Sequence, residues 1–179
     1  MSRAITRSSR DTVRAMRVGV CVVLALAACG PTAVEIKTAK DARYDASAQD
    51  VYAQAEAETA TTYEIGERLP DELIFATVPS WYSDNGRLSR DAEDAQKTAG
   101  NMQVSFVVVV SVEVTKTAVI VTPKVIDYTP GVAKPTDIGP NDPKLPAWIT
   151  KRADELQVAI HKRIQAKLPP RTTTSAAPK

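Results

Sequence analysis

Few residues in this chain of 179 have the types and spacing that chemistry needs. His161 is the only histidine and there are two cysteines, fewer ligands than a typical protein zinc site uses. The acid pairs Asp71/Glu72 and Glu93/Asp94 are residue types that glycoside hydrolysis uses, but they lie in turn-rich segments where solvated acids are common. No serine stands in a Gly-x-Ser-x-Gly context. We therefore expect no catalytic residue, no metal site and no cofactor in this chain. We expect His161 to lie at the boundary between the buried and exposed faces of the last helix.

Cys29 has the most specific surroundings of any residue. Residues 1–17 hold five arginines and one acid, and residues 18–28 are uncharged and apolar. A basic start, a short apolar run and small residues before a cleavage point form a secretory signal. Eleven apolar residues are too few to cross a bilayer, which takes about 20. A retained buried helix or anchor and an arginine-rich mitochondrial transit peptide are the alternatives.

The tetrapeptide Leu26-Ala27-Ala28-Cys29 resembles the lipobox of bacterial lipoproteins. The resemblance implies that residues 1–28 are removed as a signal peptide and that Cys29 is lipidated, which holds the protein on a membrane of the bacterial cell envelope. In such lipoproteins an Asp after the cysteine often retains the protein in the inner membrane. Gly30 stands there instead, so we expect the outer membrane, with the domain facing the periplasm.

Removal of the signal changes the charge of the chain. Residues 1–28 contain five of the 23 basic and one of the 21 acidic residues, so the net charge falls from +2 to −2. No basic field remains to attract nucleic acid. The one remaining cysteine carries the expected lipid, so no internal disulfide can form, and the domain must be held by its core.

The first regular element expected after the signal is a helix that begins at Ser47. Ser47 can cap it, and Asp50 three residues later gives a weaker form of the capping box. One mostly alanine face repeats every three or four residues: Ala48, Val51, Tyr52, Ala55 and Thr59. Residues 29–41 before it are read as a tether, with a short first strand as the alternative.

Two strands and a long polar loop are expected next. A short extended piece at 63–65 and a turn at Pro70-Asp71 lead into a return strand over 73–82, with a bulge or an edge position at Pro79. Residues 83–101 are polar and rich in turn formers, and are read as a mobile loop that is disordered or merely solvated, with a functional loop as the alternative.

The clearest strand signal is an unbroken alternation over 102–115. A turn at 115–117 joins it to a second strand over 118–128, where Pro123 indicates a bulge or an edge. Residues 129–146, with five prolines, are expected to be neither helix nor strand. A helix with a regular apolar stripe follows and ends before Pro169-Pro170.

These elements predict an α+β fold: a single antiparallel sheet of about four strands, with two helices packed on one face. The expected divisions are residues 1–28 as signal peptide, 29–41 as tether, 42–168 as the domain and 169–179 as a disordered tail. The core is expected to bring one face of the long strand onto the last helix: Val104, Phe106, Val108, Val110 and Val112 against Ile149, Leu156, Ile160 and Ile164.

The order of helix, Tyr63-x-Ile65, turn, strand, long hairpin and final helix is similar to that of envelope-assembly lipoproteins, namely the C component of the outer-membrane barrel-assembly machine. This resemblance implies a membrane-anchored, non-enzymatic module that binds an envelope protein or supports assembly. An envelope enzyme, or a binder of a cell-wall or lipid ligand, is the alternative.

The residues expected to bind the partner are those that two helices would leave uncovered. Trp81 and Tyr82 lie beside the polar loop, and Val107 and Val109 are the apolar part of the long strand's second face. Exposed aromatic residues with apolar neighbours supply much of the energy of protein interfaces. Packing of the two aromatic side chains under the loop is the competing interpretation.

Overall fold

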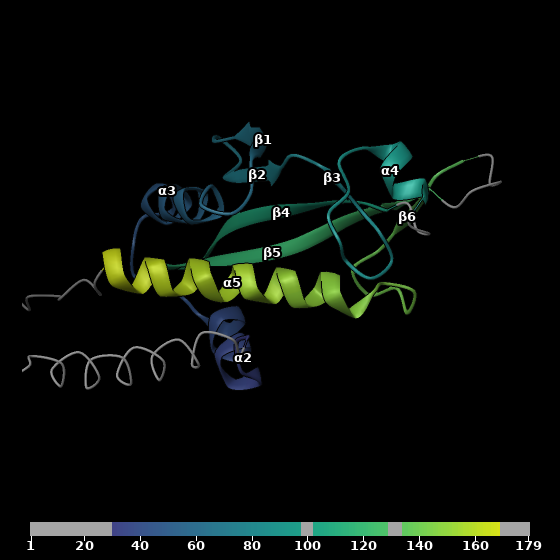
Figure 1. Cartoon of the computed structure of the whole chain (residues 1–179). Helices are drawn as coiled ribbons and strands as arrows, with labels where there is room; N and C mark the ends of the chain where they lie inside the picture. Colours follow the sequence, from purple (N-terminus) through teal and green to yellow (C-terminus); the bar gives the residue numbers. More distant parts are fainter. Residues whose placement is uncertain (1–29, 98–101, 129–133, 169–179) are drawn as a thin grey trace, which may run out of the picture. The chain divides into compact units, whose positions relative to one another are not determined.

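A computed structural model describes residues 30–97, 102–128 and 134–168. They form an α+β domain with one antiparallel sheet (Figure 1), which confirms the expected class. The described part has six strands and four helices, so the expected numbers were too low. The helices are α2 (Ala33–Asp41), α3 (Ala48–Thr59), α4 (Ala92–Lys97) and α5 (Ala147–Lys167). The strands are β1 (Ile65–Leu69), β2 (Ile74–Thr77), β3 (Ser80–Tyr82), β4 (Met102–Glu113), β5 (Lys116–Asp127) and β6 (Thr136–Ile138). The signal segment, Cys29 and the tail over 169–179 lie outside the described residues.

The strands lie in the order β1-β2-β4-β5-β6, and β3 also pairs with β4. The return strand expected over 73–82 is thus divided into β2 and β3, as Pro79 indicated. Beside this interruption, the Phe106 backbone N–H donates to the Thr77 hydroxyl at 2.9 Å. A side chain therefore takes the place of a ladder carbonyl at the break.

The β4–β5 hairpin is long and regular, with pairs running from Met102↔Asp127 to Glu113↔Lys116. Its turn consists of Val114 and Thr115 and not of residues 115–117 as expected, and Val114 takes a left-handed φ of 59°. Pro123 lies at the edge of the sheet, because β6 pairs only with Val125–Asp127. Proline tolerates this position since its missing N–H would have had no strand to bond.

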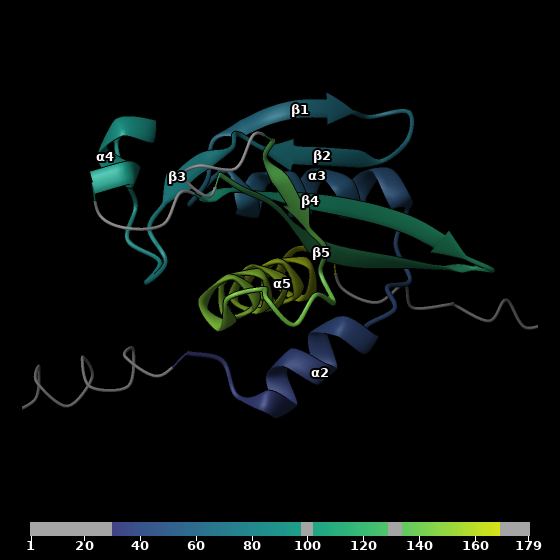
Figure 2. The same cartoon turned by 90° about the vertical axis from the view of Figure 1, so that its right-hand side faces the viewer.

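Helices α3 and α5 cover one face of the sheet (Figures 1 and 2). Helix α3 begins as expected at Ser47, whose hydroxyl accepts a hydrogen bond from the Asp50 N–H at 3.1 Å. The two helices pack on each other, and among the strands α3 contacts chiefly β4 while α5 contacts chiefly β5. The shared core holds most of the residues predicted for it: Val104, Phe106, Val108, Val110, Ile149, Leu156, Ile160 and Ile164.

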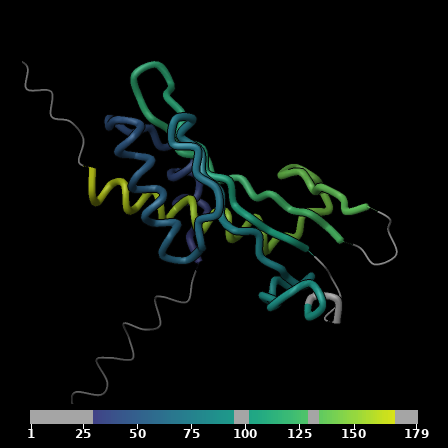
Figure 3. The backbone as a smooth tube through the Cα atoms, turned by 90° about the horizontal axis from the view of Figure 1, so that it is seen from above, coloured from purple at the N-terminus to yellow at the C-terminus, as the bar shows by residue number. Residues whose placement is uncertain are grey.

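Val112 is the exception to the predicted core, since 61% of it is exposed. It lies near the tip of the hairpin, which extends past α3 and α5 in the view from above (Figure 3). The alternating pattern continues beyond the point where the helices end. The prediction for Val112 was therefore wrong.

The structure also corrects the tether expected over 29–41, because residues 33–41 form helix α2. Thr32 and Glu35 make a full capping box: the Thr32 hydroxyl accepts from the Glu35 N–H, and the Glu35 carboxylate accepts from the Thr32 N–H. Ala39 is buried against α5. The polar-apolar alternation at 34–37 indicated an extended segment, so the capping box was not recognised. The packing of α2 on α5 could not be read from the sequence.

Two segments expected to lack regular structure contain short elements. The proline-rich stretch over 129–146 supplies β6, which was not foreseen because three residues are too few to leave a pattern. The polar segment over 83–101 contains α4, and residues 83–89 form an ordered loop. None of the helices in the described ranges is long and apolar enough to cross a membrane.

Candidate functional site

The sheet face that points away from α3 and α5 carries a row of aliphatic side chains, and we call it the outer face. Directly paired residues point to the same side of a sheet, and the pairing aligns one residue from each of four strands: Leu69, Ile74, Val109 and Ile120. Ile120 is 50% exposed and Leu69 38%. Among the described helices, α2, α3 and α5 all lie on the opposite side (Figure 2).

The next row on the outer face contains Ala76 and Val107, with Glu67 and Thr122 at its two ends. The pairing thus brings together Val107 and Val109, two of the residues expected to bind a partner. Glu67 and Lys124, both exposed, flank the apolar centre with opposite charges. An apolar centre with a polar rim is the usual composition of a protein interface.

Trp81 and Tyr82 are neighbours in the sequence but point to opposite faces. Trp81 pairs with Gln103 on the outer side, is half-buried, and packs its ring 4.8 Å from that of Tyr128. Tyr82 is only 4% exposed and belongs to the core. The expectation that Tyr82 is an exposed aromatic beside Trp81 was therefore wrong.

Tyr82 is buried because the start of α5 covers it. Its ring lies 5.2 Å from that of Trp148, and the Arg152 guanidinium is 4.8 Å from its centre. Trp148 donates from its indole N–H to the Asp84 carbonyl at 2.8 Å, and Arg152 donates to the Gly86 carbonyl at 2.9 Å. These contacts fasten the loop over 83–89 onto α5.

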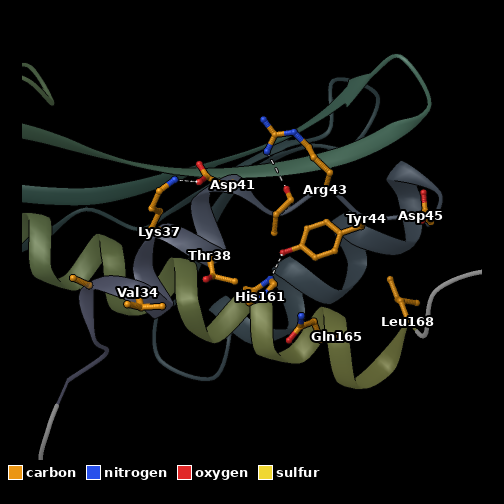
Figure 4. Close-up of a pocket in the computed structure, with 12 residues that line it drawn as sticks. Val34, Lys37, Thr38, Asp41, Arg43, Tyr44, Asp45, His161, Gln165 and Leu168 are labelled. Carbon is orange, nitrogen blue, oxygen red and sulfur yellow. Dashed lines mark hydrogen bonds and ion pairs between the residues drawn. The ribbon is translucent and has the colours of Figure 1, made fainter.

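A pocket of about 1000 Å³ lies between α2, the segment over 42–45 and the end of α5 (Figure 4). Val34 lies at one end in this view and Leu168 at the other, with Tyr44 and His161 between them. No sequence pattern indicates this site, because the pocket depends on the unforeseen helix α2.

The Tyr44 hydroxyl and His161 Nδ1 form a buried hydrogen bond of 2.9 Å inside this pocket. Burial raises the pKa of Tyr44 to about 12, so the phenol keeps its proton and can donate it. Burial, and secondarily the charge of Lys162, lowers the pKa of His161 below its ordinary value of 6.5. Near neutral pH the ring is therefore uncharged. His161 is buried, as the boundary interpretation allowed, but it also lines a cavity.

The charged residues at the rim of the pocket already have ionic partners. Lys37 is paired with Asp41 one helical turn later, and this pairing lowers the pKa of Asp41. Arg43 donates from Nε to Glu113 at 2.6 Å. The rim is therefore close to neutral.

Gln157 joins three parts of the structure through one buried amide. Its Oε1 accepts from the Val121 N–H at 2.9 Å, and its Nε2 donates to the Val119 carbonyl at 3.1 Å. The same Nε2 lies 3.3 Å from the Ala39 carbonyl at the end of α2. The side chain thus bonds the edge of β5 much as a neighbouring strand would.

The acid pairs named from the sequence belong to two separate elements. Asp71 and Glu72 are exposed in the β1–β2 turn, and Glu93 and Asp94 lie in the first turn of α4. Within the described ranges, no three residues of the kinds that bind metals are close enough to hold an ion.

Comparison with known proteins gives no further guide to this site: no family model matches the chain, and no curated protein is similar to it.

Proposed function

We propose that this chain is a lipid-anchored protein of the bacterial envelope whose domain binds another envelope protein through the outer sheet face. The lipobox at Leu26–Cys29 supports the anchor, and Gly30 supports the outer membrane. The aliphatic row across β1, β2, β4 and β5 carries the interaction part of the proposal. The resemblance of the sequence layout to that of the C-component lipoproteins of barrel assembly supports a non-enzymatic role.

The partner that fits this face is a protein with an apolar patch of its own. The centre of the face is aliphatic, and Glu67 and Lys124 flank it with opposite charges. Trp81 stands on the same side, and a half-buried tryptophan is a frequent energetic centre of an interface.

The test places a photoreactive amino acid at Ile120 in the native host. We expect it to capture one discrete envelope protein, whereas the same group at Gln49, an exposed position in α3 on the opposite side of the sheet, captures none. Ile120→Lys should then abolish co-purification of that protein and leave the melting temperature unchanged. Equal capture from Gln49, or full co-purification with Ile120→Lys, would reject this face as the binding site.

Trp81→Ala gives a second measurement on the same complex. It should weaken co-purification, because the indole is an interface anchor. Its cost in stability should fall below the about 3–5 kcal/mol of a fully buried aromatic residue, since Trp81 is half-buried. A loss of stability in the full range would mean that Trp81 acts through the core alone.

The alternative function of ligand binding has one specific observation in its favour, the pocket between α2 and α5.

A further inference from the structure

We propose that the pocket between α2 and α5 binds one acyl chain of a lipid-like amphiphile, with an oxygen of its polar head hydrogen-bonded to His161 Nε2. The size of the pocket, about 1000 Å³, is within the range of small-molecule sites. Its walls are largely apolar, with Ala33, Val34, Ala42, Leu168 and the Tyr44 ring.

The head-group contact follows from the hydrogen bonding of His161. If the Tyr44 hydroxyl donates to Nδ1, the neutral imidazole carries its hydrogen on Nε2. The reverse assignment would leave the phenol hydrogen without an acceptor among the described residues. Nε2 has no bonding partner in the described part of the chain, so it can donate to a carboxyl or ester oxygen.

The rim gives no reason to expect a highly charged ligand. Lys37 and Arg43 have their own carboxylate partners, and His161 is neutral at pH 7. A ligand with a long apolar part and an oxygen acceptor matches both the apolar walls and the His161 donor.

The position of the pocket in the chain suggests where such a ligand comes from. Ala33, which lines the pocket, is four residues after Cys29, so the two Cα atoms are separated by at most about 14 Å. If the proposed anchor exists, its acyl chains begin within reach of the pocket. A free fatty acid or membrane lipid is the other source of the same chemistry.

The test feeds the native host a photoactivatable palmitate analogue, irradiates the cells and maps the adducts on the purified protein by mass spectrometry. We expect adducts on peptides that contain pocket residues. Thr38 is an exposed residue of the pocket wall, so Thr38→Trp places an indole in the pocket and should remove these adducts. Leu88→Trp, at an exposed position outside the pocket, is the control and should leave them unchanged. Absence of pocket adducts, or equal yield from Thr38→Trp, would overturn the proposal.

Two further variants test the source of the acyl chain and the head-group contact separately. If Cys29→Ala removes the adducts, the bound chain is that of the protein's own anchor, and if adducts persist it is a free lipid. If Cys29 carries no lipid but adducts form in the pocket, the proposed anchor is rejected and the proposed lipid pocket is supported. The double variant Tyr44→Phe/His161→Phe keeps both rings and should lower the adduct yield about fivefold, the size of one hydrogen bond. An unchanged yield would refute the assigned head-group contact.

Discussion

Gln157 shows how much of this fold depends on one polar side chain. It lies on α5 with 2% of its surface exposed, and its amide satisfies a backbone N–H and a backbone carbonyl of β5. Buried backbone groups are nearly always paired, and the edge of β5 near Val119 and Val121 has no neighbouring strand among the described elements.

Gln157→Leu should lower the free energy of unfolding by about 2–5 kcal/mol, because it leaves these buried groups without partners. Denaturant titration measures the effect. Gln49→Leu, an exposed glutamine in α3, is the matched control and should change stability by no more than about 0.5 kcal/mol. A similar loss in both variants would contradict the role given to Gln157.

His161 predicts how stability depends on pH. Its pKa in the folded protein is lower than the ordinary 6.5, so below pH 6.5 the unfolded chain takes up the proton more readily. The free energy of unfolding should therefore be full above pH 6.5 and fall as the pH drops toward the lower pKa of the folded state. Glu35, whose pKa is lowered to about 2, chiefly by the hydrogen bond from Lys162, adds its own loss only below about pH 4.5.

Denaturant titrations at pH 7.5 and 5.5 test this dependence. His161→Asn keeps a hydrogen-bonding atom near the position of Nδ1 and removes the titrating ring, so its two values should be closer together than those of the original protein. No other histidine exists in the chain to produce the same slope. An identical slope in the variant would show that another group titrates.

At the scale of elements, coverage by the helices decides which alternating residues of β4 are core. Phe106 is 1% exposed and Val112 is 61% exposed, although both belong to the same alternating face. Phe106→Ala should cost about 3–5 kcal/mol, and Val112→Ala should be close to neutral. Thermal unfolding of the two variants compares a covered with an uncovered position, and unchanged stability for Phe106→Ala would refute the packing.

The loop over 83–89 depends on a glycine at its contact with α5. Gly86 has a φ of 79°, and a Cβ there would lie 2.8 Å from Trp148 Cδ2. Gly86→Ala should therefore lower stability by about 1–3 kcal/mol. Gly139→Ala, where a Cβ would meet no atom within 4 Å, is the control. Equal melting temperatures for both variants would mean that the loop can move away from Trp148 at no cost.

The elements that could be predicted are those whose signal is local and repeated. The β4 alternation, the Ser47 cap and the stripe of α5 each correspond to an observed strand or helix. Helix α2 was missed because its apolar pattern is weak and Ala39 is buried only by α5. The sequence left exposure and burial of Tyr82 as alternatives and gave no sign that Gln157 is buried, since Arg152 and the β5 edge approach these residues only in the folded chain.

At the scale of the whole molecule, the proposed lipid anchor rests on Cys29. Cys29→Ala should leave an unprocessed or soluble exported form, since lipid attachment requires the thiol. Mass spectrometry of the N-terminus of the mature protein gives the direct measurement. An unmodified N-terminus at another residue would show that the protein is not lipid-anchored.

The groups that bond the edge of β5 also affect the tendency of this protein to aggregate at high concentration. A long strand with free backbone groups invites another chain to add a strand, and this is a route to aggregation. Along β5, Tyr44 pairs with Thr117, Gln157 bonds Val119 and Val121, Pro123 offers no N–H, and β6 pairs with Val125–Asp127. The outermost strands of the described sheet, β1 and β6, are five and three residues long. The domain therefore presents only short edges to its neighbours, and this should keep it monodisperse at high concentration.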